Sequence, residues 1–168
     1  MKTKILLYEL VGILFITILG STLHFTYELS GNSEFVAVFS AVNESVWEHI
    51  KLVVWPAIFF ALIEIWPLRG LANNFWLAKT TSIYFMVLLI PLISYSYTAL
   101  TGASILLVDS AAFVITVILG QLLSYKLLTH RGLSPKLGGV AVVLLISLAA
   151  AFVVFTFMPP QFPIFQDP

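Results

Sequence analysis

Five long apolar runs divide this chain, and each is long enough to cross a lipid bilayer as an α-helix. They cover residues 5–27, 46–66, 75–97, 104–128 and 137–158. Of the 168 residues, 60% are hydrophobic and 10% are charged, whereas about a quarter are charged in a typical soluble protein. A surface with so few charges must face lipid, where backbone polar groups are satisfied inside helices. We therefore expect an all-α, polytopic bundle of five transmembrane helices that forms one domain over residues 1–168.

Two further segments do not have the length of a span. Within residues 33–43, four apolar side chains share one helical face: Phe35, Val38, Phe39 and Val42. This pattern predicts a short interfacial helix between the first and second spans, with a re-entrant segment as the alternative. The tail, residues 159–168, contains four prolines and is expected to be extended. Pro91 lies inside the third span and predicts a kink there.

The distribution of charge predicts the orientation in the membrane. With five spans, seven of the eight basic residues fall on one side: Lys2, Lys4, Arg69, Lys79, Lys126, Arg131 and Lys136. Six of the eight acidic residues fall on the other side. Because basic residues are retained in cytoplasmic loops, we expect a multi-pass protein of the cell (cytoplasmic) membrane, with the N-terminus in the cytoplasm and the C-terminus outside.

The composition also excludes several classes of function. The chain has no cysteine, which excludes disulfides, thiolate nucleophiles and cysteine-ligated zinc or iron–sulfur sites. Its net charge is zero, so bulk electrostatics do not favour binding to nucleic acid. The expected partner is membrane lipid. The small residues of the fifth span also suit close packing against a second copy or another membrane protein.

Ionisable side chains gather at the predicted outer ends of the first, second and fourth spans. His24 and Glu28 are four residues apart on one helical face, and Glu44, His49 and Asp109 are expected at a similar depth. Charged groups at membrane depth are costly and mark functional sites. Imidazole and carboxylate together are typical ligands of zinc or non-haem iron. The candidate ligands of a divalent metal are His24, Glu28, Glu44, His49 and Asp109, and the candidate catalytic groups are Glu44, Glu48, His49 and Asp109.

Structural explanations compete for some of these residues. The spacing of Ser45 and Glu48 matches a capping box at the start of the second span. Lys51 has Glu44 and Glu48 as potential ion-pair partners. At the other side of the membrane, Glu9 and Glu64 are expected to pair with Lys4, Arg69 or Lys79, and a proton path toward the outer cluster is the alternative.

One segment carries a resemblance to a known family. The run Asn43-Glu44-Ser45-Val46-Trp47-Glu48-His49 resembles the N-E-S-x-W-E-H segment of small bacterial and archaeal integral membrane proteins, a family of unknown function. The ending, residues 159–168, is similar to the P-P-x-x-P-x-F-x-D-P tail of that family. The resemblance covers the motif, the tail and the layout of the spans, and it implies no particular activity.

Three hypotheses about function remain open at this stage. The first is a metal-dependent hydrolase of a lipid or lipid-linked substrate at the outer leaflet. The second is a small transporter, channel or proton-coupled carrier, which Glu9 and Glu64 suggest. The third is a non-catalytic accessory subunit or a ligand-binding protein, including a haem protein with His24 and His49 as the two axial ligands.

Overall fold

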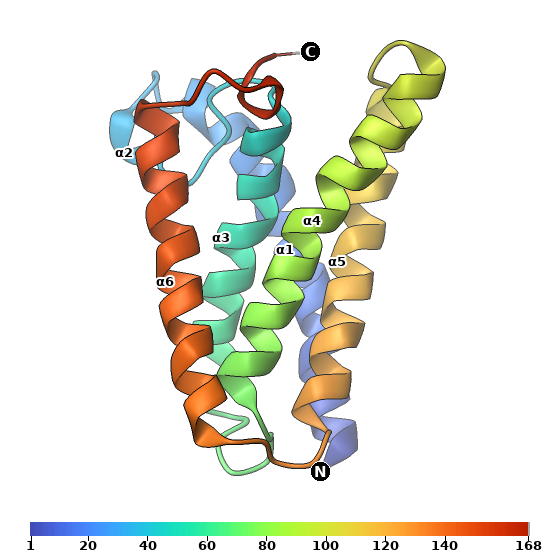
Figure 1. The fold of residues 1–168 in the computed structure, drawn as a ribbon, viewed down its shortest axis with the longest axis vertical. Helices are drawn as coiled ribbons and strands as arrows, with labels where there is room; N and C mark the ends of the chain where they lie inside the picture. The colour runs from blue at the N-terminus through green and yellow to red at the C-terminus, as the bar shows by residue number, and fades with distance from the viewer. Residues whose placement is uncertain (168) are drawn as a thin grey trace.

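In the computed structural model, five long helices form one bundle, and long helices that follow one another in sequence run in opposite directions (Figure 1). The structure describes residues 1–167, except for the side chain of Pro135. The long helices are α1 (Lys2–Leu29), α3 (Val46–Glu64), α4 (Phe75–Thr101), α5 (Leu106–Leu128) and α6 (Pro135–Phe157). All five are long and apolar enough to cross a membrane. Two short elements complete the fold, the helix α2 (Glu34–Ala37) and the 3₁₀ turn η1 (Pro163–Phe165). The expected all-α protein with five apolar spans is confirmed.

The helix α3 lies at the centre of this arrangement. It contacts both α1 and α4, and it is the most buried of the five long helices. The helix α5 packs between α1 and α4, while α6 packs mainly on α4. Buried apolar side chains from all five long helices meet in mid-bundle, among them Ile16, Val53, Met86, Val117 and Leu145. This cluster forms the core of the protein.

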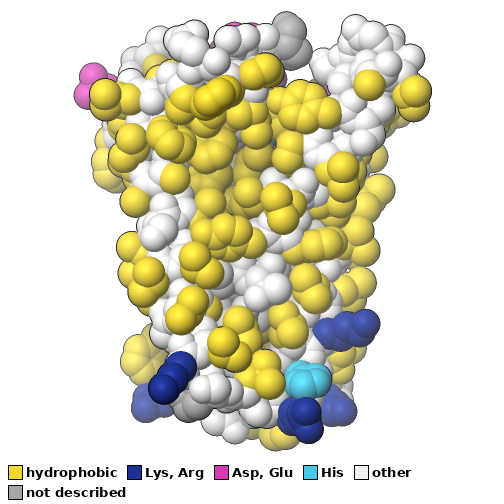
Figure 2. All heavy atoms as spheres, in the orientation of Figure 1, with side chains coloured by type: hydrophobic (Ala, Val, Ile, Leu, Met, Phe, Trp, Pro, Cys, Tyr) yellow, Lys and Arg dark blue, Asp and Glu magenta, His cyan; other side chains and the backbone are white. Residues whose placement is uncertain are grey.

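The outer surface of the bundle is apolar, as a surface that faces lipid requires. Leucine and isoleucine side chains are exposed along all the long helices, for example Leu14, Leu88 and Ile146. Figure 2 shows this apolar belt on one face, with Lys and Arg side chains gathered at the end where the N-terminus lies. We call that end the N-terminal end of the bundle, and the opposite end, with α2 and η1, the C-terminal end.

The segment between α1 and α3 is helical over only four residues, α2, and then folds back on the bundle. The ring of Phe39 packs against Trp55 and Phe59, with centroids 4.9 and 5.8 Å apart. The hydroxyl of Ser40 accepts a hydrogen bond from the backbone N–H of Tyr27 at 2.9 Å. The predicted short helix is therefore present but shorter than residues 33–43, because Phe39 and Ser40 are held against α1 and α3.

The tail differs from the extended segment that the sequence predicts. In its described part, up to residue 167, Pro159 and Pro160 precede the 3₁₀ turn η1, and Pro163 begins it. The turn forms because Phe165 packs against Trp47 and Phe155, with ring centroids 4.8 and 5.5 Å apart. The tail thus covers the start of α3 at the C-terminal end of the bundle (Figure 1).

Candidate metal site

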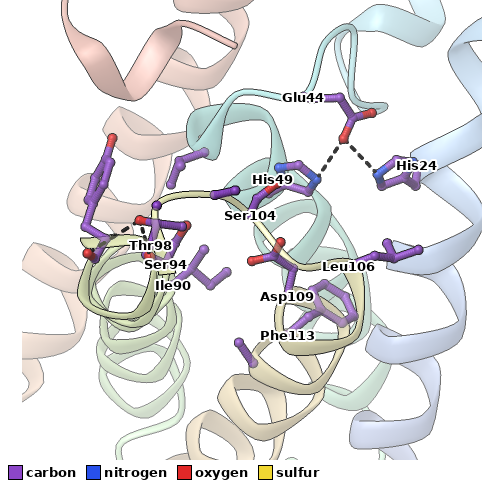
Figure 3. Close-up of a pocket in the computed structure, with 15 residues that line it drawn as sticks. His24, Glu44, His49, Ile90, Ser94, Thr98, Ser104, Leu106, Asp109 and Phe113 are labelled. Atoms are coloured by element: carbon purple, nitrogen blue, oxygen red, sulfur yellow. Dashed lines mark hydrogen bonds and ion pairs between the residues drawn. The ribbon is translucent and has the colours of Figure 1, made fainter. Parts of the chain in front are cut away.

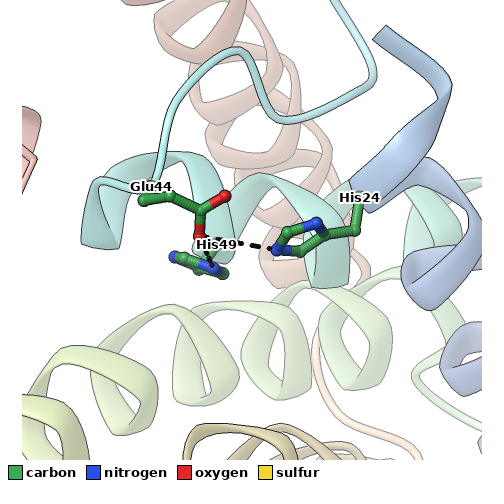
Figure 4. A group of neighbouring side chains, drawn as sticks. All are labelled: His24, Glu44 and His49. Atoms are coloured by element: carbon green, nitrogen blue, oxygen red, sulfur yellow. Dashed lines mark ion pairs between the residues drawn. The ribbon is translucent and has the colours of Figure 1, made fainter. Parts of the chain in front are cut away.

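Three potential metal ligands converge at the C-terminal end of the bundle. His24 comes from α1, Glu44 from the loop before α3, and His49 from the first turns of α3 (Figure 4). The Oε2 atom of Glu44 lies 3.7 Å from Nε2 of His24 and 3.4 Å from Nε2 of His49. One ligand atom from each residue can be chosen so that all three lie within 4.8 Å of one another. We call these three residues the His–Glu–His group.

The close approach of α1 and α3 brings the two histidines together. Gly20 packs against the main chain of Leu52, and a Cβ at position 20 would collide with the Leu52 carbonyl oxygen. The helices are antiparallel, so one turn farther toward the C-terminal end His24 faces His49. Their ring centroids are 5.4 Å apart.

The orientation of the His49 ring is set by its own helix. Its Nδ1 atom lies 3.0 Å from the carbonyl oxygen of Ser45, one turn earlier. An N–H at Nδ1 donates to that carbonyl and leaves the lone pair of Nε2 directed at Glu44. Hydrogen bonding of the second ring nitrogen in this way is the usual arrangement for a metal-binding histidine.

The loop that carries Glu44 is held by hydrogen bonds from three of its backbone N–H groups. The backbone N–H of Glu44 donates to Oδ1 of Asp167 in the tail at 2.9 Å. The N–H of Ser45 donates to the side chain of Asn43 at 3.0 Å, and that of Val42 donates to Glu48 at 3.0 Å. The Glu44 carboxylate is itself well exposed, at 63%. Fixed backbone thus positions a side chain that remains accessible.

Glu48 supports the site and does not enter it. It is buried and forms an ion pair with Lys51 at 2.5 Å. Lys51 also donates to the carbonyl oxygen of Ala37 at 2.8 Å and to the hydroxyl of Thr156 at 3.0 Å. The capping box is present in part: Ser45 Oγ accepts from the Glu48 N–H at 3.4 Å, but the Glu48 carboxylate binds Val42 in place of Ser45. Glu48 and Lys51 therefore tie α2, α3 and α6 together.

A cavity of about 740 Å³ lies beside the His–Glu–His group, between α1, α3, α4 and α5 (Figure 3). In Figure 1, α4 and α5 lean away from α3 and α6 toward the C-terminal end, and the cavity occupies this region. Asp109 of α5 lines it, and its Oδ1 accepts a hydrogen bond from the hydroxyl of Tyr97 at 2.7 Å. The remaining wall combines apolar side chains with hydroxyls: Ile90, Leu106, Phe113, Ser94, Thr98 and Ser104.

The structure thus brings three of the five candidate metal ligands together and places a fourth, Asp109, in the same cavity. The fifth, Glu28, is exposed one turn beyond His24 and does not line the cavity. Sequence reasoning missed Gly20, because a glycine inside an apolar run gives no sign of the helix that packs on it. It also missed Thr98 and Ser104, which are polar but belong to no recognisable motif.

A second polar cluster lies near the N-terminal end of the bundle. The Nζ atom of Lys79 in α4 contacts carboxylates from two other helices, Glu9 of α1 and Glu64 of α3. The distance from Nζ to Oε1 of Glu9 is 2.6 Å. Of the three expected partners for these glutamates, Lys79 is the one that the structure supplies. Lys4 and Arg69 are exposed.

The comparisons with known proteins place the chain in a family. A family model described as "Family of unknown function (DUF6512)" matches residues 2–168, so the chain belongs to that family. The expected membership in a family of unknown function is confirmed. No curated protein and no solved structure matches the chain.

Proposed function

We propose that this membrane protein is a metal-dependent hydrolase that acts on an amphiphilic, membrane-resident substrate in the cavity beside the His–Glu–His group. The observation that carries the proposal is the convergence of His24, Glu44 and His49 at the edge of a cavity that also contains Asp109. Two imidazoles and one carboxylate are the donor set of a well-known class of catalytic zinc sites, in which the fourth position is open to water.

The distances support a transition-metal ion. Two ligand atoms bound to one tetrahedral zinc ion at about 2.0–2.1 Å lie about 3.3 Å apart. The two Nε2–Oε2 distances of 3.4 and 3.7 Å are close to that value, and all three ligand atoms lie within 4.8 Å of one another, so movement of the side chains toward one another would complete the coordination. Calcium and magnesium prefer sites made of oxygen atoms. Zinc is therefore the ion that we propose.

Asp109 is the group that we propose as general base. A zinc ion held by His24, Glu44 and His49 would supply a water molecule of lowered pKa. The Asp109 carboxylate, which lines the same cavity, would accept a proton from that water as its oxygen adds to an ester or phosphoester group of the substrate. As the bond to the leaving group breaks, Asp109 would return the proton to the departing oxygen. Because Tyr97 contacts only Oδ1, the second oxygen of Asp109 remains available for this exchange.

The cavity walls favour a substrate with both polar and apolar parts. Ile90, Leu106 and Phe113 offer apolar contacts, whereas Ser94, Thr98 and Ser104 offer hydroxyls. A lipid or a lipid-linked molecule combines both chemistries. The orientation of the protein is part of the proposal: basic residues at the N-terminal end favour the cytoplasmic side for that end and the outer leaflet for the cavity.

A haem between His24 and His49 is less favoured by the geometry. The carboxylate of Glu44 contacts both imidazoles, and a haem would have to displace it. One shared carboxylate oxygen between two imidazoles instead suits a single ion that all three residues ligate.

The proposal is tested with the full chain purified in lipid nanodiscs made from a total lipid extract and supplied with zinc. We expect one zinc per chain and time-dependent release of lipid hydrolysis products, detected by mass spectrometry. His24→Ala and His49→Ala should each lose both zinc and hydrolysis. Asp109→Asn should keep zinc and lose hydrolysis.

The third histidine supplies the matched control. His130 is exposed at the N-terminal end, so His130→Ala should retain zinc and activity. Glu44→Gln should also lose zinc, whereas Glu28→Gln, which changes an exposed carboxylate outside the cavity, should retain it. Zinc binding without any product in the wild type would refute the hydrolase and leave a binding protein. Zinc content unchanged in His24→Ala and His49→Ala would refute the site itself.

A further inference from the structure

The cluster of Glu9, Lys79 and Glu64 contains more negative than positive charge in a buried place. The three side chains come from α1, α4 and α3, and they are 1%, 3% and 0% exposed. Two ionised carboxylates around one ammonium group would leave one uncompensated negative charge. Burying such a charge at membrane depth is unfavourable, and proteins avoid it by protonation or by binding a cation.

The geometry couples the two carboxyl groups directly. The Oε1 atoms of Glu9 and Glu64 contact the same Nζ atom of Lys79. Carboxylates this close to each other do not both ionise readily, and such a pair shares one proton. Lys79 satisfies one negative charge, so the pair as a whole retains a single proton.

Buried oxygen atoms without a hydrogen-bond partner mark the positions at which a proton can be placed. The second oxygens of both carboxyls, Oε2 of Glu9 and Oε2 of Glu64, are buried without a hydrogen-bond partner. Ser124 of α5 is fully buried next to the Glu9 carboxyl, and its Oγ has no well-formed hydrogen bond either. A carboxylic O–H on Glu9 can donate to the Ser124 hydroxyl, which is an acceptor as well as a donor.

We infer that the Glu9–Lys79–Glu64 cluster is a proton-binding site, in which the two carboxyl groups share one exchangeable proton at neutral pH. No other charged side chain in the described part of the chain forms an ion pair with the cluster. The uncharged groups near it are Gln121 and Ser124 of α5, the Phe75 ring of α4, and Tyr8 and Tyr125 in the adjoining apolar cluster.

The proton site is separate from the His–Glu–His group. The apolar cluster in mid-bundle, which includes Ile16, Phe60, Met86 and Val117, lies between the two ends. We therefore expect the proton to exchange through the N-terminal end of the bundle. Its presence neutralises the junction of α1, α3 and α4, and its loss leaves a buried negative charge there.

Infrared difference spectroscopy of the full chain in nanodiscs tests this inference. At neutral pH the wild type should show a protonated carboxylic C=O band that shifts in D₂O and declines as the pH is raised. Glu64→Gln and Glu9→Gln should each abolish the band, because one glutamate with Lys79 forms a neutral ion pair. Asp109→Asn, at the far end of the bundle, should leave it unchanged.

Two outcomes would overturn the inference. One is that the wild type shows no carboxylic band at neutral pH, whether or not the buffer contains sodium. That result would mean that both carboxylates are ionised. The other is a band that survives in both glutamine variants and disappears in Asp109→Asn. The wild-type measurement in D₂O stands even where a variant fails to fold. None of these outcomes depends on zinc binding or on hydrolysis.

Discussion

Gly20 of α1 packs against the carbonyl group of Leu52 in α3, in a space that no side chain could enter. The Leu52 carbonyl is free for this contact because Pro56, four residues later in α3, has no N–H to donate to it. The phenyl ring of Phe113 in α5 closes the other side, 2.7 Å from where a Cβ of residue 20 would lie. This contact sets the separation of α1 and α3 directly below His24 and His49.

Gly20→Ala should therefore damage the metal site without touching a ligand. An added methyl group forces α1 away from α3, and overpacking of this kind costs about 1–3 kcal/mol. We expect a lower Tm in a thermal unfolding assay, and a lower zinc affinity because the separation of His24 and His49 increases. Gly139→Ala is the matched control, because no atom beyond its own turn of helix lies within 4 Å of its Cβ position. Equal zinc affinity in the two variants would contradict this account.

The contact between the tail and the Glu44 loop should also affect metal binding. Asp167→Ala removes the acceptor of the Glu44 N–H, a bond at an exposed position. Hydrogen bonds contribute about 0.5–1.5 kcal/mol each, so zinc affinity should fall several-fold while Tm changes little. Asp109→Ala serves as a comparison, because it removes a carboxylate of the cavity that does not hold the loop. A titration with a fluorescent zinc competitor measures the zinc affinity of both variants. Full wild-type affinity in Asp167→Ala would rule out a positioning effect of the tail.

The buried pair of Lys51 and Glu48 predicts a large and asymmetric effect on stability. Lys51→Met leaves the Glu48 carboxylate buried without its partner, which typically costs about 3–5 kcal/mol. The double variant Lys51→Met with Glu48→Gln should recover much of that loss, because no unpaired charge remains. Chemical unfolding of both variants, monitored by tryptophan fluorescence, gives the comparison. Equal destabilisation of the single and double variants would show that the ion pair is not the cause.

The five spans could be predicted from the sequence because their signal is local. A run of about 20 apolar residues is required by the thickness of the bilayer, whatever the run packs against. The Phe39 ring and the Phe165 ring show the limit of such reasoning. Each ring packs on aromatic residues of another element, which holds its segment against the bundle. As a result, α2 is shorter than predicted, and the tail forms the turn η1 in place of an extended segment.

The candidate site could be predicted in its residue types but not in its geometry. The motif places Glu44, Glu48 and His49 within six residues, yet helix phase buries Glu48 beside Lys51 and leaves Glu44 and His49 facing the cavity. The pairing of Glu9 with Lys79 joins residues 70 positions apart. It depends on which helices are neighbours, and that information is not contained in any single run.

The proposed orientation has its own test, which the absence of native cysteine makes simple. Glu34→Cys and Arg131→Cys introduce single thiols at exposed positions at opposite ends of the bundle. In intact cells, a membrane-impermeant maleimide should label Glu34→Cys at once and Arg131→Cys only after permeabilisation. The reverse pattern would place the His–Glu–His group on the cytoplasmic side.

The central claim, a zinc ion held by the His–Glu–His group, is tested most directly by X-ray absorption at the zinc edge on the purified full chain. We predict a first shell of two imidazole nitrogens and carboxylate or water oxygens at about 2.0–2.2 Å, with one imidazole fewer in His49→Ala and no change in His130→Ala. A zinc shell that is the same in the wild type and in His49→Ala, or a wild type that retains no zinc, would contradict the account.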